Sequence, residues 1–311
     1  MTQAPTTLAP TIQASTIRAQ GGDTRQGFLL ALAAYLFWGA LPLYLRQVNH
    51  IALPEVLAHR VFWSVPIALL VLIVLGRTAD LRRAIVQPRM VAMAGVTALL
   101  VSVNWGVYLY SIQSGRVLEA ALGYYINPLF SIFLGAVFLH ERLSPAQWSA
   151  VALAGAAVAL LTWDAGRLPV LSLALTISWG FYALAKRALP IGPNQGFTLE
   201  VILLSPFALA YLGWLAIRGD LQFGATGIGD MGLLIGCGVA TAVPLMLYAN
   251  GAKGLRLTTI ALMQYIAPTF ILLVAVFIFG EPFEGAKRVA FPMIWAALVL
   301  YSADLIWRRR R

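Results

Sequence analysis

Three ionisable side chains lie close together in an otherwise apolar stretch. Glu55, His59 and Arg60 fall within six residues, and such groups are functional by default at membrane depth, where charge is expensive. Arg60 would lie six residues, or about 9 Å, into a helix that begins near residue 54. Two interpretations stay open for it: a buried cation that binds an anionic substrate group or pairs with an acid, or an arginine that snorkels to the interface. His59 points to a different face and is a candidate for proton coupling.

Aromatic and amide side chains in the middle of apolar stretches form a second group of candidates. The interfacial belt does not explain aromatics at this depth. Any one of them could be ordinary packing, but as a set they favour a cavity that stacks flat or apolar organic molecules. Prolines at 128 and 268 would kink the helices that carry them. With Arg60, the candidate substrate-binding residues are Trp38, Trp63, Asn104, Trp105, Tyr108, Tyr124, Tyr125, Asn127, Trp179, Tyr248, Gln264 and Tyr265.

The remaining acids have structural interpretations. Glu141 and Glu281 follow the ends of two apolar stretches, where a carboxylate opposes the helix dipole. We therefore expect each to have a partner from the next loop. Glu119 and Glu200 lie near the ends of predicted spans, and an interfacial position is expected for both.

Catalytic and cofactor chemistry is not indicated. The sequence has no HExxH, GxSxG or phosphate-loop motif and no pair of aspartates. Its three histidines, His50, His59 and His140, are not at metal-ligand spacing. The single cysteine, Cys237, lies in an apolar stretch and is expected to be a packing residue. We predict neither an enzyme nor a bound metal or cofactor.

The composition indicates the class of fold that positions these residues. Of the 311 residues, 60% are hydrophobic and 11% charged, against roughly 25% charged in soluble domains. Lipid must therefore cover part of the chain. A net charge of +10 would suggest nucleic acid in a soluble protein, but these basic residues lie in short loops. We predict an all-α integral membrane protein with ten transmembrane helices, at 27–46, 54–75, 90–112, 117–139, 145–163, 168–186, 196–217, 230–250, 256–279 and 288–307.

The distribution of basic residues predicts the orientation. Fifteen of the 22 Lys and Arg residues fall on one side of the predicted bundle. The positive-inside rule then places both termini in the cytoplasm. Residues 1–26, rich in Thr, Ala, Gln and Gly, are predicted to be a disordered cytoplasmic tail, and 308–311 a basic C-terminal tail.

The sequence repeats itself at an offset of 140 residues. Tyr125, Pro128 and Glu141 align with Tyr265, Pro268 and Glu281, Pro66 aligns with Pro206, and Trp38-Gly39 aligns one residue off with Trp179-Gly180. This predicts two repeats, 27–163 and 168–307, of five helices each. Since five is odd, the second repeat enters the membrane from the opposite face. Inverted repeats are a recurring device of secondary transporters.

Several of these motifs resemble a known family. Trp38-Gly39, Glu55…His59-Arg60…Trp63-Ser64, Asn104-Trp105, the segment 119–129 (EAALGYYINPL), Glu141-Arg-Leu and Gln147-Trp148 are similar to the RarD-type proteins of the EamA family, in the drug/metabolite transporter superfamily. The resemblance implies ten helices, two EamA repeats, a bacterial inner-membrane location and a permease or exporter. One name in the family is linked to chloramphenicol sensitivity. Ala121 departs from the motif, where serine is expected.

We therefore expect a secondary transporter of small organic metabolites or drugs, such as amino-acid-like or aromatic compounds. A non-transporting membrane sensor or complex subunit is the alternative. Expected partners are a small-molecule substrate and the lipid bilayer, and nucleic acid is not expected. Small residues such as Gly232 and Gly236 suit close helix packing or a homodimer interface.

Overall fold

The computed structural model describes residues 23–308, and the regular elements in that range are all helical. They are α1 (Arg25–Arg46), α2 (Leu53–Val74), α3 (Thr78–Ile85), α4 (Pro88–Gln113), α5 (Val117–Phe138), α6 (Pro145–Ala165), α7 (Val170–Ala188), α8 (Pro193–Arg218), α9 (Ile228–Gly251), the 3₁₀ turn η1 (Ala252–Gly254), α10 (Leu257–Met263), α11 (Ile266–Leu273), the π-helical segment η2 (Val274–Ile278) and α12 (Lys287–Arg308).

Nine helical stretches within residues 23–308 are long and apolar enough to cross a membrane. The chain is thus a multi-pass membrane protein. The helix α7 is long enough but lies outside this set because Lys186 and Arg187, in its last turn, lower its mean hydropathy. The predicted tails lie mostly outside the described residues, although α1 already begins at Arg25 and α12 includes Arg308. The short helix α3 was not predicted.

Local sequence signals fix several helix ends. Ser144 and Gln147 form a capping box at the start of α6, with Pro145 in the first turn. Gly166 and Gly219 end α6 and α8 with φ of 61° and 74°, a left-handed conformation that favours glycine. Each of these two helices therefore ends at a glycine that turns the chain away from the helix axis.

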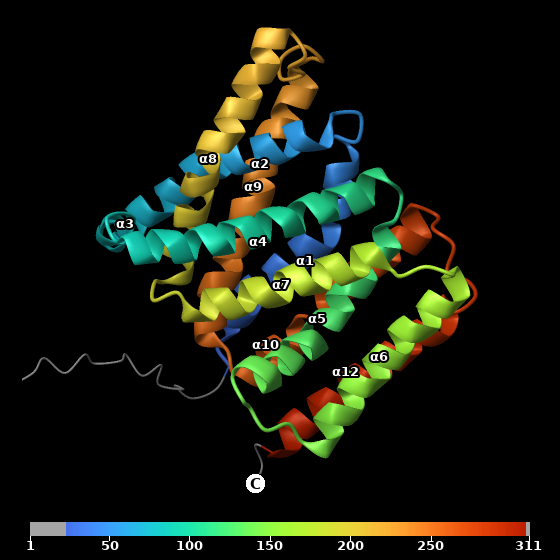
Figure 1. Ribbon diagram of the computed structural model, residues 1–311. Helices are drawn as coiled ribbons and strands as arrows, with labels where there is room; N and C mark the ends of the chain where they lie inside the picture. Colours follow the sequence, from blue (N-terminus) through green and yellow to red (C-terminus); the bar gives the residue numbers. More distant parts are fainter. Residues whose placement is uncertain (1–22, 309–311) are drawn as a thin grey trace, which may run out of the picture.

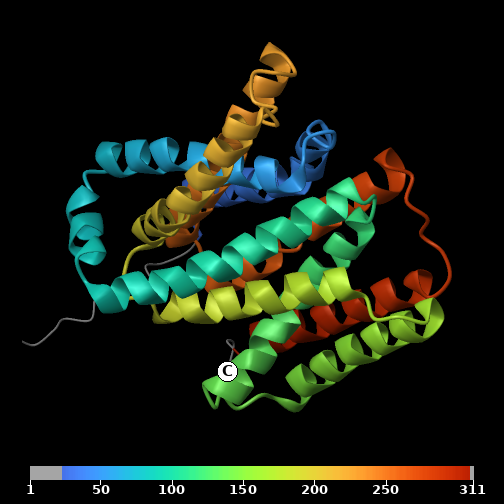
Figure 2. The same ribbon diagram turned by 45° about the horizontal axis from the view of Figure 1, so that its top comes forward.

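The helices pack around a shared centre, and one pair lies at the edge. Both α1 and α2 pack on α9, α5 and α4 pack on α7, and α2 also packs on α8. The helices α6 and α12 lie side by side at one edge of the molecule in both views (Figures 1 and 2). This arrangement leaves α1, α2, α4, α5, α7, α9 and α11 to surround the interior.

Two glycines allow helices to cross at close range. A Cβ atom on Gly39 of α1 would lie 2.5 Å from Cβ of Phe270 on α11. A Cβ atom on Gly180 of α7 would lie 2.5 Å from Cδ1 of Phe130 on α5. A side chain at either glycine would therefore push apart the helices that bound the interior.

The carboxylate of Asp23, which lies just before α1, holds this part of the chain to the start of α10. Asp23 accepts hydrogen bonds from the backbone and side chain of Arg256 at 2.8–3.1 Å and from the Thr259 hydroxyl at 2.7 Å. The hydrogen bonds from Arg256 lower the pKa of Asp23 to about 2. Because these hydrogen bonds stabilise the charged carboxylate, the contact is fully present above about pH 4 and is lost only as the pH falls through about 2.

Glu141 and Glu281 have partners, but not from the next loop as predicted. Glu281 accepts hydrogen bonds from the backbone amides of Val117 and Leu118 at 2.6 and 2.8 Å, at the first turn of α5. Glu141 lies 3.4 Å from Nη1 of Arg187, at the end of α7. The prediction was wrong because helix ends distant in sequence meet here, and the amides of a helix start attract a carboxylate.

We expect Glu281→Ala to lower the free energy of unfolding by about 1–3 kcal/mol, because it leaves two buried amides without a partner. Burial raises the pKa of Glu281 above its usual value, and the amide hydrogen bonds offset only part of that shift. Thermal unfolding in detergent measures the effect. The exposed Glu284 is the control, since Glu284→Ala should change stability little. Equal effects of the two substitutions would contradict this role of Glu281.

Candidate functional site

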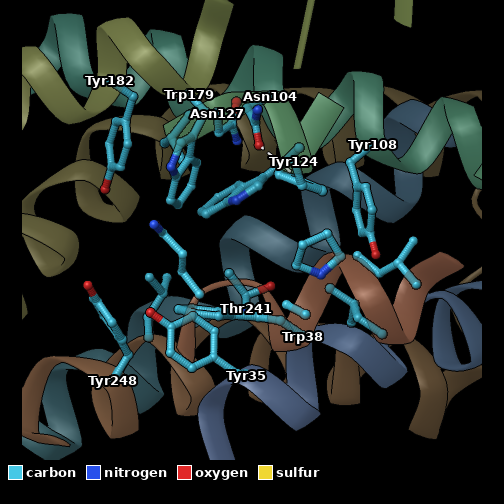
Figure 3. A pocket seen from close by; sticks show the side chains of 18 of the residues that line it. Tyr35, Trp38, Asn104, Tyr108, Tyr124, Asn127, Trp179, Tyr182, Thr241 and Tyr248 are labelled. Atoms are coloured by element: carbon cyan, nitrogen blue, oxygen red, sulfur yellow. Dashed lines mark hydrogen bonds between the residues drawn. The ribbon is translucent and has the colours of Figure 1, made fainter. Parts of the chain in front are cut away.

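A central cavity lies between α1, α2, α4, α5, α7, α9 and α11, with Gln264 contributed by the turn between α10 and α11. The centres of water-sized molecules can occupy about 200 Å³ of it. Figure 3 shows labelled side chains facing each other across the space, with those from α4, α5 and α7 on one side and those from α1 and α9 on the other. The lining residues are Tyr35, Trp38, Leu41, Arg60, Val101, Asn104, Trp105, Tyr108, Tyr124, Asn127, Pro128, Trp179, Tyr182, Thr241, Leu245, Tyr248, Gln264, Ala267, Pro268 and Ile271.

Most of the candidate residues from the sequence come together at this cavity. Those that line it are Trp38, Arg60, Asn104, Trp105, Tyr108, Tyr124, Asn127, Trp179, Tyr248 and Gln264. Three candidates lie elsewhere. Trp63 contacts Phe62 and Phe223, Tyr125 contacts Phe291 and Trp295, and Tyr265 packs on the main hydrophobic core.

Arg60 is the one charged residue in the lining of the described cavity. It is 5% exposed, so it does not snorkel to the interface. Its Nε donates to the Thr241 hydroxyl at 2.6 Å, and its guanidinium carbon lies 4.9 Å from the centre of a Trp105 ring. Its Nη1 is buried without a hydrogen-bond partner. The cavity therefore holds a cation without a carboxylate to balance it.

Two neutral polar groups in the lining also lack hydrogen-bond partners. They are the Tyr108 hydroxyl and the Asn127 side-chain oxygen, both buried. A buried polar atom without a partner costs free energy. Together with Nη1 of Arg60, these atoms can bind a polar ligand without first breaking an internal hydrogen bond.

Asn104 positions its neighbours. Its side-chain nitrogen donates to the Leu175 carbonyl at 3.1 Å and to the Ser178 hydroxyl at 3.0 Å, which ties α4 to α7. Its side-chain oxygen accepts from the Tyr124 hydroxyl at 3.3 Å. The hydrogen-bonding groups of the Asn104 amide are therefore occupied by α7, in one wall of the cavity, and by the Tyr124 hydroxyl.

Three aromatic rings pack together in the opposite wall. The rings of Tyr35, Trp38 and Tyr248 have centroids 5.6–5.7 Å apart in edge-on or tilted contacts. Tyr35 was not among the candidates, although it precedes Trp38 by three residues and so shares its helix face. The same spacing relates Tyr182, also missed, to Trp179. An i, i+3 aromatic partner was the signal that could have found both.

The helix expected at 256–279 is interrupted by a two-residue turn, although residues 259–278 still form one candidate span. α10 ends at Met263 and α11 begins at Ile266. The turn between them includes Gln264, which lines the cavity, and the lining residues Ala267 and Pro268 follow in the first turn of α11. A proline removes a backbone donor and clashes with the preceding turn. Discontinuous helices often form the binding sites of transporters, because the interruption frees backbone polar groups.

A buried ion pair lies behind the cavity wall. Glu200 is fully buried inside the protein. Its carboxylate accepts from Lys186 at 2.6 Å and from the hydroxyl of the lining residue Tyr182 at 3.3 Å. Glu200 lies near the start of α8, where Lys186 of α7 supplies the cation that pairs with it.

The proton-coupling candidate His59 does not line the cavity. Its ring stacks on Phe223 at 4.8 Å, and neither ring nitrogen makes a hydrogen bond. The neighbouring Glu55 accepts from the backbone amides of Gln222 and Phe223 at 2.8 and 3.2 Å. This part of α2 therefore holds the loop between α8 and α9.

Fold and cavity together define a class: a multi-pass helical membrane protein with an aromatic central chamber. A solved crystal structure shares this fold with a TM-score of 0.57 at 23% identity, covering 92% of this chain and 98% of the other. The EamA-like transporter family matches residues 25–163.

Curated relatives match over nearly the whole chain. Protein RarD of Escherichia coli is 38% identical over 93% of this chain and 98% of its own length. An uncharacterized transporter of Vibrio cholerae is 40% identical over 91% and 93%, and the uncharacterized transporter YojE of Bacillus subtilis is 37% identical over 93% and 98%. The chain belongs to the EamA-like transporter family, as a RarD-type member.

Proposed function

We propose that the protein is a secondary transporter of small organic molecules that works by alternating access between two inverted five-helix repeats, 27–163 and 168–307. Its termini lie in the cytoplasm, and α7 is the tenth span. Cargo binds in the central cavity, where aromatic rings contact a flat or apolar body. The proposal rests most directly on the way in which the two halves share the cavity lining.

Residues at equivalent positions of the two repeats line the cavity together. Of its 20 lining residues, 16 fall into eight pairs at the offset of 140 residues, or 141 for the first helix of each repeat. These pairs are Trp38 and Trp179, Leu41 and Tyr182, Val101 and Thr241, Trp105 and Leu245, Tyr108 and Tyr248, Tyr124 and Gln264, Asn127 and Ala267, and Pro128 and Pro268. A site at a repeat interface can open to either face when the halves exchange conformations.

The contacts between helices also match when the two repeats are interchanged. The contact of α5 with α7 corresponds to that of α11 with α1, and the contact of α4 with α7 to that of α9 with α1. The close crossings at Gly39 and Gly180 are also equivalent, since their partners Phe270 and Phe130 are 140 residues apart. These correspondences support a duplicated bundle.

Single-cysteine labelling tests the inverted arrangement. Cys237→Ser removes the one native thiol, and Ala79→Cys, Pro190→Cys and Ala225→Cys each add one at an exposed position. We expect a membrane-impermeant maleimide to reach positions 79 and 190 from the cytoplasmic side and position 225 from the other. Labelling of positions 79 and 190 from opposite sides would overturn the inverted repeats.

Uptake into proteoliposomes tests the transport function. Radiolabelled 3-phenylpropionate, phenylalanine and phenethylamine share one flat apolar body, and we expect the protein to move at least one of them faster than empty liposomes do. Tyr248→Ala, which opens the aromatic wall, should slow that flux. If every flux equals the empty-liposome rate, transport of this class of molecule is contradicted.

A further inference from the structure

We infer that the cargo is an organic monoanion: a small aromatic body with one carboxylate-like group, which binds Arg60. We expect molecules that carry an ammonium group, whether zwitterions or cations, to bind more weakly than such monoanions. The inference rests on the proposed transport function and names its substrate class. Three independent observations of the cavity carry it: an uncompensated cation, the ion-paired state of the carboxylate behind Tyr182, and the two unpartnered neutral groups.

Arg60 lacks the partner that a buried guanidinium requires. A buried charge costs several kcal/mol unless it is paired and hydrogen-bonded. Here the neutral Thr241 hydroxyl and the face of Trp105 contact it, while Nη1 donates to nothing in the described structure. Thr241 is also committed, because it donates to the Cys237 carbonyl at 2.8 Å. An anionic group that accepts from Nη1 would supply the missing charge.

A cargo ammonium group would find no free carboxylate here. The lining, as far as the structure describes it, contains neither Asp nor Glu. Glu200 contacts the lining residue Tyr182 from behind, and Lys186 already neutralises this carboxylate at 2.6 Å. Glu200 occupies the position in the second repeat that Arg60 occupies in the first. The duplicated site therefore keeps one free charge, and that charge is positive.

The neutral groups suit the rest of such a cargo. The unpartnered Tyr108 hydroxyl can donate to a second anionic oxygen, and the unpartnered Asn127 oxygen can accept from a hydroxyl or N–H on the body. The rings of Tyr35, Trp38 and Tyr248 offer flat apolar surface for the remainder. Because a guanidinium binds two oxygens in one plane, carboxylate geometry fits it well.

Three matched ligands test the inference on the full chain in nanodiscs. Compared with phenylalanine, 3-phenylpropionate lacks the ammonium group and phenethylamine lacks the carboxylate. The shift in melting temperature with ligand concentration gives each dissociation constant. We expect 3-phenylpropionate to bind at least about ten-fold more tightly than either of the others. Phenethylamine lacks the anion that accepts the charge-assisted hydrogen bond from Arg60, and the ammonium group of phenylalanine would be buried without a carboxylate partner. Arg60→Gln should remove this preference, and Arg116→Gln, whose arginine is already paired with Glu119, should keep it.

Each possible outcome of this experiment either supports or overturns the monoanion class. Equal or tighter binding of phenylalanine or phenethylamine overturns the monoanion class, and so does a preference for 3-phenylpropionate that survives Arg60→Gln. If Arg60→Gln fails to fold, the wild-type ranking still decides. Failure of all three to bind also overturns the class. The transport function is judged separately, because uptake of phenylalanine or phenethylamine in proteoliposomes would uphold it while this inference fails.

Discussion

Lys186→Met is expected to lower the free energy of unfolding by about 3 kcal/mol. The substitution strands the fully buried carboxylate of Glu200 with one hydroxyl, that of Tyr182 at 3.3 Å. Removing one member of a buried ion pair costs roughly 3–5 kcal/mol. We take the lower end because the Lys186 side chain is 21% exposed. Reversible thermal or denaturant unfolding in detergent measures the loss.

A double substitution separates this electrostatic effect from lost packing. Lys186→Met combined with Glu200→Gln should recover most of the stability, because no unpaired charge remains and the glutamine still accepts from Tyr182. Arg187→Met is the matched control on the same turn. Its partner Glu141 is 3.4 Å away and both side chains are more than half exposed, so a change below about 0.5 kcal/mol is expected. If the double variant is no more stable than Lys186→Met, the ion pair does not explain the loss.

Arg60→Met is expected to reduce the transport of an aromatic carboxylate by about 10- to 100-fold. Methionine keeps an unbranched apolar chain but removes the cavity's charge and the donor Nη1. A hydrogen bond to a charged group contributes roughly 1.5–3 kcal/mol, which corresponds to a factor of this size. The initial rate of 3-phenylpropionate uptake into proteoliposomes, at concentrations below saturation, measures the effect.

The control for Arg60→Met is an arginine that does not line the cavity. Arg116 pairs with Glu119 at 2.6 Å, and Arg116→Met should leave the uptake rate unchanged. Arg60→Lys should fall between wild type and Arg60→Met, because an ammonium keeps the charge but loses the planar fork. Uptake by Arg60→Met at the wild-type rate would remove Arg60 from the binding site.

Local patterns in the sequence anticipated the helices and much of the cavity lining. Apolar stretches of about 20 residues locate spans because lipid supplies no hydrogen bonds to the backbone. Mid-span aromatic and amide side chains such as Trp38, Asn104 and Asn127 predicted the cavity lining, because polar groups at that depth are costly and usually face the interior of the bundle. Both inferences depend on neighbours within one helix.

What the sequence could not supply was the pairing between distant helices. The ion pair of Glu200 with Lys186 could not be predicted, because the two residues lie on different helices. Trp63 and Tyr125 were expected at the cavity, but the rotation of their helices turns them toward Phe223 and Phe291. A kink was predicted at both Pro128 and Pro268, but only the helix that carries Pro268 is interrupted, between α10 and α11, while α5 stays continuous. The two prolines have the same local context, so the sequence did not distinguish them.

The central claim is that one cavity, shared by both repeats, opens in turn to each side of the membrane. Leu245→Cys in a Cys237→Ser background places the one thiol of the chain on the cavity wall, at the repeat equivalent of Trp105. A membrane-impermeant maleimide is applied to right-side-out and to inverted vesicles. We predict labelling in both, slowed in both by saturating 3-phenylpropionate. Labelling from one side alone, with and without the ligand, would contradict the account.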